Sequence, residues 1–305
     1  MKSIIYTLDM PLTARLIVKD MEKTSEINEF PIVFGSHGLQ LNGKIILPKK
    51  ASANEPVPGA VLCHGFGAAY RVMEPAARIM ASQGVASLIF DLRGHGASEG
   101  AIDGMMAEDV IDAWNILCQR PEVDGRRMGI AGHSLGAMTA IMAAEKVSNP
   151  RALVALACPP EIDSQLPVSG SNNMGRWGRD FKAITEYPRH GAFPWLKGIA
   201  ALICRIWMYL GRFKVRVDWE KFIDVFPQMK MSAVLEKLED CSKLFVFCEG
   251  DRVTPYRKYA VVYESACEPK ELILAKGGFH TTPLLAGNLR SQWTDWLVKT
   301  LTDNE

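Results

Sequence analysis

Residues 129–138 read GIAGHSLGAM and place Ser134 between two glycines, Gly132 and Gly136. An apolar segment precedes the serine, and a helical pattern follows it. Glycines on both sides let a strand and a helix approach closely at a tight turn, where any Cβ would clash. The stretch therefore predicts a strand–turn–helix that holds the Ser134 hydroxyl clear of the backbone at the carboxyl end of a sheet. The alternative is a serine that only caps the helix N-terminus.

The chain on both sides of this turn alternates between strands and helices. Continuous apolar runs predict buried strands at 60–65, 85–91, 127–134, 152–160, 243–251 and 271–278. Amphipathic stretches predict helices at 71–83, 105–119, 136–147 and 287–301. Two shorter strands, 30–34 and 43–48, are expected to pair as a hairpin, and residues 1–25 as an extra strand or an arm. This alternation predicts an α/β fold whose mostly parallel central sheet has helices on both faces.

The alternation stops between 161 and 240, so these residues are expected to form an inserted helical lid or cap. The core domain would then comprise 1–160 and 241–305. The insertion is rich in aromatic residues with arginines between them. One interpretation is a helical lid with its own small core and a solvated basic face. The other is an apolar acyl or aryl pocket with a basic entrance, and 193–213 would allow weak contact with a membrane surface.

Composition excludes several classes of function. The formal net charge of the 305 residues is +1, which gives no electrostatic reason to expect a nucleic-acid partner. The seven cysteines show neither C-x-x-C spacing nor a zinc-like cluster with histidine, as expected for reduced thiols and no metal. The first residues do not read as a signal peptide, and the most apolar stretch contains Lys197 and Arg205. These features favour a cytoplasmic protein.

A nucleophilic serine needs a base, and the base needs an orienting acid. His280 follows the strand 271–278, and Asp251 ends the strand 243–251. In a parallel sheet both would lie at the same edge as Ser134, in the chain order serine, acid, histidine. A surface-turn aspartate and a helix-capping histidine are the alternatives for the two residues taken singly. His133 is expected to point away from the serine.

An oxyanion needs at least two hydrogen-bond donors. The N–H of Leu135, directly after the serine, is the first candidate. The second is the N–H of Phe66, in the segment HGFG (64–67) that follows a predicted strand. His64 is expected to brace this loop rather than to take part in the chemistry.

These motifs together resemble the α/β-hydrolase superfamily, over roughly 30–160 and 240–303. The matching segments are HGFG, DLRGHGASEG (91–100), GHSLG, EGDRVTP and GGFH. The resemblance is to the bacterial cinnamoyl/feruloyl esterase-like and acylaminoacyl-peptidase-like branches. It implies that Asp91 and the turn Arg93–Ser98 shape the pocket floor without being catalytic.

The sequence departs from this superfamily at one position and leaves a second choice of acid open. Cys248 stands where the acid turn of the superfamily usually has a glycine. Some lipases carry the acid after the preceding strand, where this chain has Glu161 and Asp163. Asp251 is the first choice for the acid.

The resemblance implies acyl transfer in two steps through an acyl-enzyme on Ser134, with His280 as base and Asp251 orienting it. No metal or organic cofactor is needed. The expected substrate is a small-molecule carboxylic ester with an apolar acyl or aryl group. A thioester such as an acyl-CoA, or acyl transfer to an alcohol, would use the same triad. A non-catalytic binding protein is the alternative from another class.

Overall fold

The computed structural model describes residues 3–6, 26–159, 215–218, 221, 225 and 228–303. In these ranges one nine-stranded sheet runs through the molecule in the order β1-β9-β8-β7-β6-β4-β5-β3-β2. The strands are β1 (Ser3–Tyr6), β2 (Ile27–Ser36), β3 (Leu39–Pro48), β4 (Val57–Cys63), β5 (Ala86–Phe90), β6 (Val123–His133), β7 (Ala152–Leu156), β8 (Ser242–Cys248) and β9 (Lys270–Ala275). All neighbouring strands are parallel except the pairs β2–β3 and β3–β5. The predicted mostly parallel sheet is therefore confirmed.

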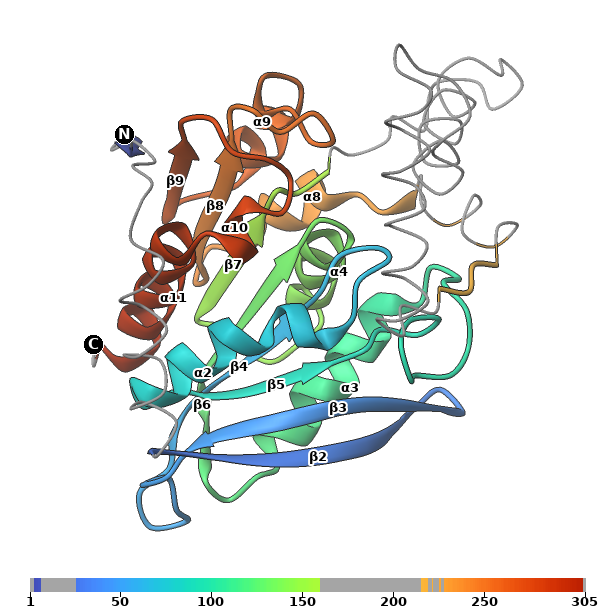
Figure 1. The fold of residues 1–305 in the computed structure, drawn as a ribbon, viewed down its shortest axis with the longest axis vertical. Coiled ribbons are helices and arrows are strands. Elements are labelled where there is room, and N and C mark those ends of the chain that lie inside the picture. The colour runs from blue at the N-terminus through green and yellow to red at the C-terminus, as the bar shows by residue number, and fades with distance from the viewer. Residues whose placement is uncertain are drawn as a thin grey trace, which may run out of the picture.

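Helices cover both faces of the sheet (Figure 1). The described helices are α2 (Glu74–Ser82), α3 (Met106–Cys118), α4 (Leu135–Ala144), α8 (Met231–Leu235), α9 (Tyr256–Ser265), α10 (Thr282–Leu285) and α11 (Gly287–Thr302), and a 3-10 turn spans Tyr70–Val72. One buried cluster joins one face of the sheet to α3, α4, α8 and α9. A second joins the other face to α2, α10 and α11. Every residue of β4 is buried, as its continuous apolar sequence requires.

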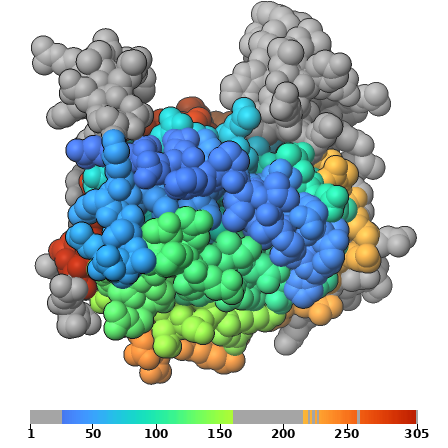
Figure 2. Space-filling model, turned by 90° about the horizontal axis from the view of Figure 1, so that it is seen from below, coloured from blue at the N-terminus to red at the C-terminus, as the bar shows by residue number. Residues whose placement is uncertain are grey.

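The predicted hairpin is longer than expected. β2 and β3 pair over their whole lengths, from Ile27↔Pro48 to Ser36↔Leu39, and turn at His37 and Gly38. In the space-filling view of Figure 2 this hairpin is part of the blue surface, beside the green residues from the middle of the sequence. At the other edge of the sheet β1 pairs with β9, so the first residues supply an extra strand.

Most of the expected insertion, 161–240, lies outside the described residues, which resume at 215. Its last part is described, and Met231, Val234 and Leu235 of α8 are buried in the first core cluster. The chain between Val215 and Asp218 pairs with the loop after β5: His95 bridges Val215, and Ile102 bridges Val217. The described stretch 215–218 of the expected insertion therefore lies against this loop of the core.

Candidate active site

The turn at Ser134 has the geometry that the glycine pattern predicts. β6 ends at His133, α4 begins at Leu135, and Ser134 between them has φ 54° and ψ −119°, a strained conformation for a residue with a side chain. A Cβ on Gly132 would lie 2.1 Å from the Gly136 carbonyl oxygen. A Cβ on Gly136 would lie 2.4 Å from the carbonyl oxygen of His64. The turn can therefore form only with glycine at both positions.

Asp251 lies just beyond β8 and is held by its own turn. Its Oδ1 accepts hydrogen bonds from the N–H groups of Val253 at 2.8 Å and Thr254 at 3.0 Å. Its Oδ2 accepts one from Thr254 Oγ1 at 2.6 Å. Burial alone would raise the pKa of Asp251, but His280 and the Thr254 hydrogen bonds outweigh it and lower the pKa to about 2. The carboxylate is therefore ionised at neutral pH.

His280 lies on the loop after β9 and is bonded to this carboxylate. Its Nδ1 lies 2.8 Å from Asp251 Oδ2. Since the carboxylate is ionised and can only accept, Nδ1 carries the hydrogen and Nε2 is left with a lone pair. The His280 side chain is 18% exposed, whereas that of Asp251 is 1% exposed. A buried acid thus orients a partly accessible base.

His133 joins the serine turn to the base loop. Its Nε2 lies 2.8 Å from the carbonyl oxygen of His280, and the two rings are 4.8 Å apart. Because a carbonyl only accepts, this nitrogen must carry the hydrogen. In the described part of the chain no hydrogen bond joins the Ser134 hydroxyl to His280. The bond from His133, the residue before Ser134, ties the His280 loop to the backbone of the serine turn instead. Catalytic hydrogen bonds between nucleophile and base often tighten only when substrate binds. This contact was not predicted from the sequence, which indicated only that the His133 ring points away from Ser134.

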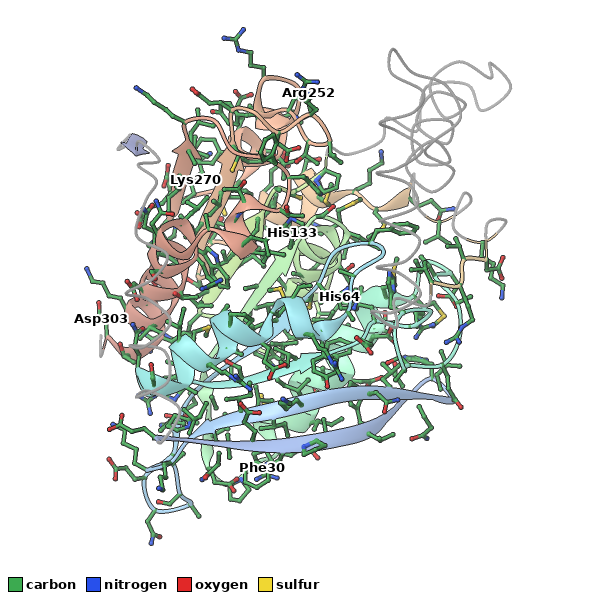
Figure 3. All side chains as sticks on the ribbon, viewed as in Figure 1. Phe30, His64, His133, Arg252, Lys270 and Asp303 are labelled. Atoms are coloured by element: carbon green, nitrogen blue, oxygen red, sulfur yellow. The ribbon has the colours of Figure 1, made fainter. Side chains whose placement is uncertain are left out.

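The two expected oxyanion donors flank the serine. Leu135 is the first residue of α4, so its N–H has no acceptor within the helix. Phe66 lies on the loop after β4, and a Cβ on its neighbour Gly65 would lie only 3.2 Å from Ser134 Cβ. The bracing role predicted for His64 is confirmed, because its two ring nitrogens bond the backbone of Gly65 and Leu92. Figure 3 shows His64 and His133 in the middle of the molecule.

Asp91, in the loop after β5, accepts hydrogen bonds from two backbone N–H groups. Its Oδ1 accepts from the Tyr70 N–H at 2.7 Å and its Oδ2 from the Ala97 N–H at 2.9 Å. A Cβ on Gly96 would lie 2.0 Å from Oδ2. The carboxylate thus ties the turn after β5 to the chain just before α2, and it bonds none of the three proposed catalytic side chains.

The remaining expectations concern the rival acids, metal binding and contact with a membrane. The rival acids Glu161 and Asp163 lie outside the described residues. Within the part of the chain that is described, no group of three or more His, Cys, Asp or Glu side chains could hold a metal ion. In the same part, no helix is long and apolar enough to span a membrane. Cys248 is the buried last residue of β8.

Comparisons with known proteins agree with this fold. A family model described as the alpha/beta hydrolase family matches residues 60–287. Thiohydrolase aneE of Aspergillus aculeatus is 37% identical over 129 residues, which are 40% of this chain and only 38% of the fungal protein. An uncharacterized 31.7 kDa protein of Escherichia coli is 32% identical over 238 residues, 70% of this chain and 80% of that protein.

Solved structures share the fold at low sequence identity. Est1E of Butyrivibrio proteoclasticus, solved with ferulic acid bound, has a TM-score of 0.62 and 15% identity, over 88% of this chain and 96% of that chain. The family match covers well over half of the chain, from β4 to the start of α11. Together with the strand order and the strained serine turn, it shows that this chain belongs to the alpha/beta hydrolase family, a family of hydrolases.

Proposed function

We propose that this protein is a serine hydrolase that cleaves a carboxylic ester with an apolar acyl or aryl group. One observation carries the proposal: His280 Nδ1 lies 2.8 Å from Asp251 Oδ2, and His133 ties the His280 loop to the strained turn of Ser134. A buried acid, an oriented imidazole and a partly exposed serine at the end of parallel strands are the parts that nucleophilic acyl transfer requires.

In this mechanism Ser134 Oγ attacks the substrate carbonyl while His280 Nε2 takes its proton. The N–H groups of Leu135 and Phe66 stabilise the negative oxygen of the tetrahedral intermediate. Protonated His280 then gives its proton to the leaving alcohol, and the acyl group stays on Ser134. Water, deprotonated by His280, releases the acid and restores the serine. Asp251 stays ionised throughout and stabilises the imidazolium.

Exposed apolar side chains on the segments that carry Asp251 and His280 support an apolar substrate. Phe279 is 76% exposed and directly precedes His280. Leu285, on α10, is 69% exposed, and Val253, two residues after Asp251, is 41% exposed. The Phe279 backbone is fixed, since its N–H donates to Thr282 Oγ1 at 2.7 Å. These side chains give an acyl or aryl group apolar surface to contact beside the reacting carbonyl.

The second candidate is a thioesterase with the same triad. The observation that favours it is the 37% identity to a fungal thiohydrolase, over part of each chain. Ester and thioester hydrolysis need the same nucleophile, base and oxyanion donors, so the side chains of the triad do not separate the two.

The test is hydrolysis of p-nitrophenyl esters from acetyl to palmitoyl, in parallel with acyl-CoA thioesters followed by thiol release. Ser134→Ala is the control. We expect ester hydrolysis that is lost in the variant by at least about 10³-fold. Faster turnover of thioesters than of every ester would favour the thioesterase. Equal activity of Ser134→Ala and wild type would contradict both candidates.

A further inference from the structure

The peptide groups on either side of Phe66 are each held by a buried histidine. The Gly65 carbonyl accepts a hydrogen bond from His64 Nδ1 at 2.8 Å. The Gly67 N–H donates to His95 Nε2 at 3.2 Å. A trans peptide is planar, so the Gly65 carbonyl and the Phe66 N–H point in opposite directions in one plane. Fixing the first fixes the second.

Both rings must be neutral, with one tautomer each. The Leu92 N–H donates to His64 Nε2 at 3.1 Å, so the hydrogen of His64 is on Nδ1. His95 Nε2 accepts from Gly67, so its hydrogen is on Nδ1, which bonds the Arg93 carbonyl at 3.1 Å. Burial lowers the pKa of His64 to about 4. Burial and the neighbouring His64 lower that of His95 to about 3. Both histidines therefore bond backbone groups and stay uncharged at neutral pH.

The turn that carries His95 is itself fixed. The Arg93 side chain is buried and paired with Asp109, its Nη2 lying 2.6 Å from Asp109 Oδ1. The Gly94 carbonyl accepts from the Arg216 N–H at 2.7 Å, next to the bridge between His95 and Val215. His95 itself is 0% exposed. Because this turn is fixed, His95 Nε2 can hold the Gly67 N–H in one position.

We propose that His95 is a positioning residue for the oxyanion donor. Together with His64 it holds the peptide groups around Phe66 so that the Phe66 N–H faces the carbonyl that Ser134 attacks. The Phe66 ring also packs edge-on against His95, with centroids 6.0 Å apart. A donor fixed before the reaction stabilises the developing charge without a cost of reorganisation. This inference rests on the proposed serine hydrolase function.

The test compares His95→Leu, which has no acceptor, with His95→Gln, whose amide can both accept and donate. Leucine at this position should lower kcat on a p-nitrophenyl ester by about 10-fold to 100-fold and change KM by less than about threefold. Glutamine should restore a large part of kcat. Amide hydrogen exchange of a peptide spanning 64–69 is the second readout, because it needs no activity: exchange should be faster in His95→Leu than in His95→Gln.

Each outcome decides the proposal. Wild-type kcat and slow exchange in His95→Leu would overturn it, as would equal loss of kcat in the two variants. If His95→Leu does not fold, His95→Asn replaces it, because the shorter amide does not reach Gly67. If wild type itself hydrolyses no ester or thioester, the proposed function fails while the exchange comparison still decides whether His95 holds this loop.

Discussion

At the scale of single residues, the hydrogen bonds around Asp251 are specific enough to test. The carboxylate accepts four: two from backbone N–H groups, one from Thr254 Oγ1 and one from His280. Thr254 Oγ1 also lies 3.3 Å from His280 Nδ1. Thr254 therefore contacts both members of the acid–base pair and fixes the position of the carboxylate.

Replacing Thr254 with valine should weaken catalysis without unfolding the protein. Valine keeps the volume but loses the hydroxyl that bonds Asp251 Oδ2, so the carboxylate is held less firmly and its pKa rises. We expect kcat/KM on the best p-nitrophenyl ester to fall by about 3-fold to 30-fold. Thr254→Ser, which keeps the hydroxyl, should stay close to wild type. Equal loss in both variants would contradict a role for the hydroxyl.

His133 gives a second prediction at this scale. His133→Phe keeps an aromatic ring but removes the donor to the His280 carbonyl, so the base loop loses its bond to the serine turn. We expect kcat to fall about 10-fold, since small displacements of a catalytic group are costly. His133→Gln retains a donor and serves as the control. Steady-state kinetics of the two variants decide this, and full activity of His133→Phe would rule the role out.

The sequence predicts that Ser134, Asp251 and His280 lie at one edge of the sheet, because each follows a parallel strand within five residues and parallel strands end at one edge. Their catalytic roles stay predictions. The contacts of Thr254, His133 and His95 could not be predicted in the same way. They join loops that are far apart in the chain, and which ring nitrogen meets which carbonyl depends on how those loops approach in space.

At the scale of elements, β6 and α4 pack so closely that the turn between them excludes side chains. α4 is buried along almost its whole length, and it also lies against the end of β4, where Gly136 meets the carbonyls of Cys63 and His64. This packing holds Ser134 in its strained conformation, because relaxing the turn would separate the helix from two strands.

Gly136→Ala should therefore destabilise the fold. Its Cβ would lie 2.4 and 2.5 Å from two backbone carbonyl oxygens, which cannot rotate away. We expect the free energy of unfolding to fall by about 3 kcal/mol or more, measured by urea denaturation. Gly287→Ala is the matched control, because nothing lies within 4 Å of its added methyl at the start of α11. A loss below about 1 kcal/mol for Gly136→Ala would contradict the packing argument.

Secondary structure was predictable where periodicity was strong. α3, α4 and α11 begin and end within three residues of the ranges predicted for them. The predicted helix at 71–83 divides into a 3-10 turn and α2, which begins at Glu74 just before Pro75. α9, which follows the Asp251 turn, was not predicted, because its sequence YRKYAVVYES mixes tyrosines and charges without a clear apolar stripe.

At the scale of the whole molecule, two buried clusters pack on opposite faces of one sheet and stabilise the strands whose carboxyl ends carry the site. The alternation of apolar runs and amphipathic helices was enough to predict this arrangement. The sequence of 161–240 has no comparable period, and its proposed role as a cap stays a prediction. Three buried histidines, His64, His95 and His133, stand at the carboxyl edge and make global stability depend on pH.

Stability should fall on acidification well before the carboxylates titrate. Burial lowers the pKa of His64 to about 4 and that of His95 and His133 to about 3, from 6.5. Below about pH 6.5 the unfolded chain binds protons that the folded chain does not, so the free energy of unfolding decreases as pH falls. Each histidine contributes up to about 1.4 kcal/mol per pH unit. Asp251, with its pKa lowered to about 2, adds a loss only between about pH 4 and pH 2.

Urea denaturation between pH 7 and pH 4.5 checks this expectation. His64→Gln should give a shallower decrease, by up to about 1.4 kcal/mol per pH unit, than wild type. His37→Gln, at an exposed turn between β2 and β3, is the control. The same slope in His64→Gln and wild type would show that His64 does not supply the acid sensitivity.

The proposed function requires that Ser134 is a nucleophile activated by Asp251 and His280. Labelling with a fluorophosphonate, which reacts covalently with activated serines, tests this claim without knowledge of the substrate. Intact-mass and peptide analysis should find one label per chain, on Ser134. Ser134→Ala should stay unlabelled, and His280→Ala should react at least about 100-fold more slowly. A folded wild-type protein that takes up no label, or takes it up on another residue, would contradict the account.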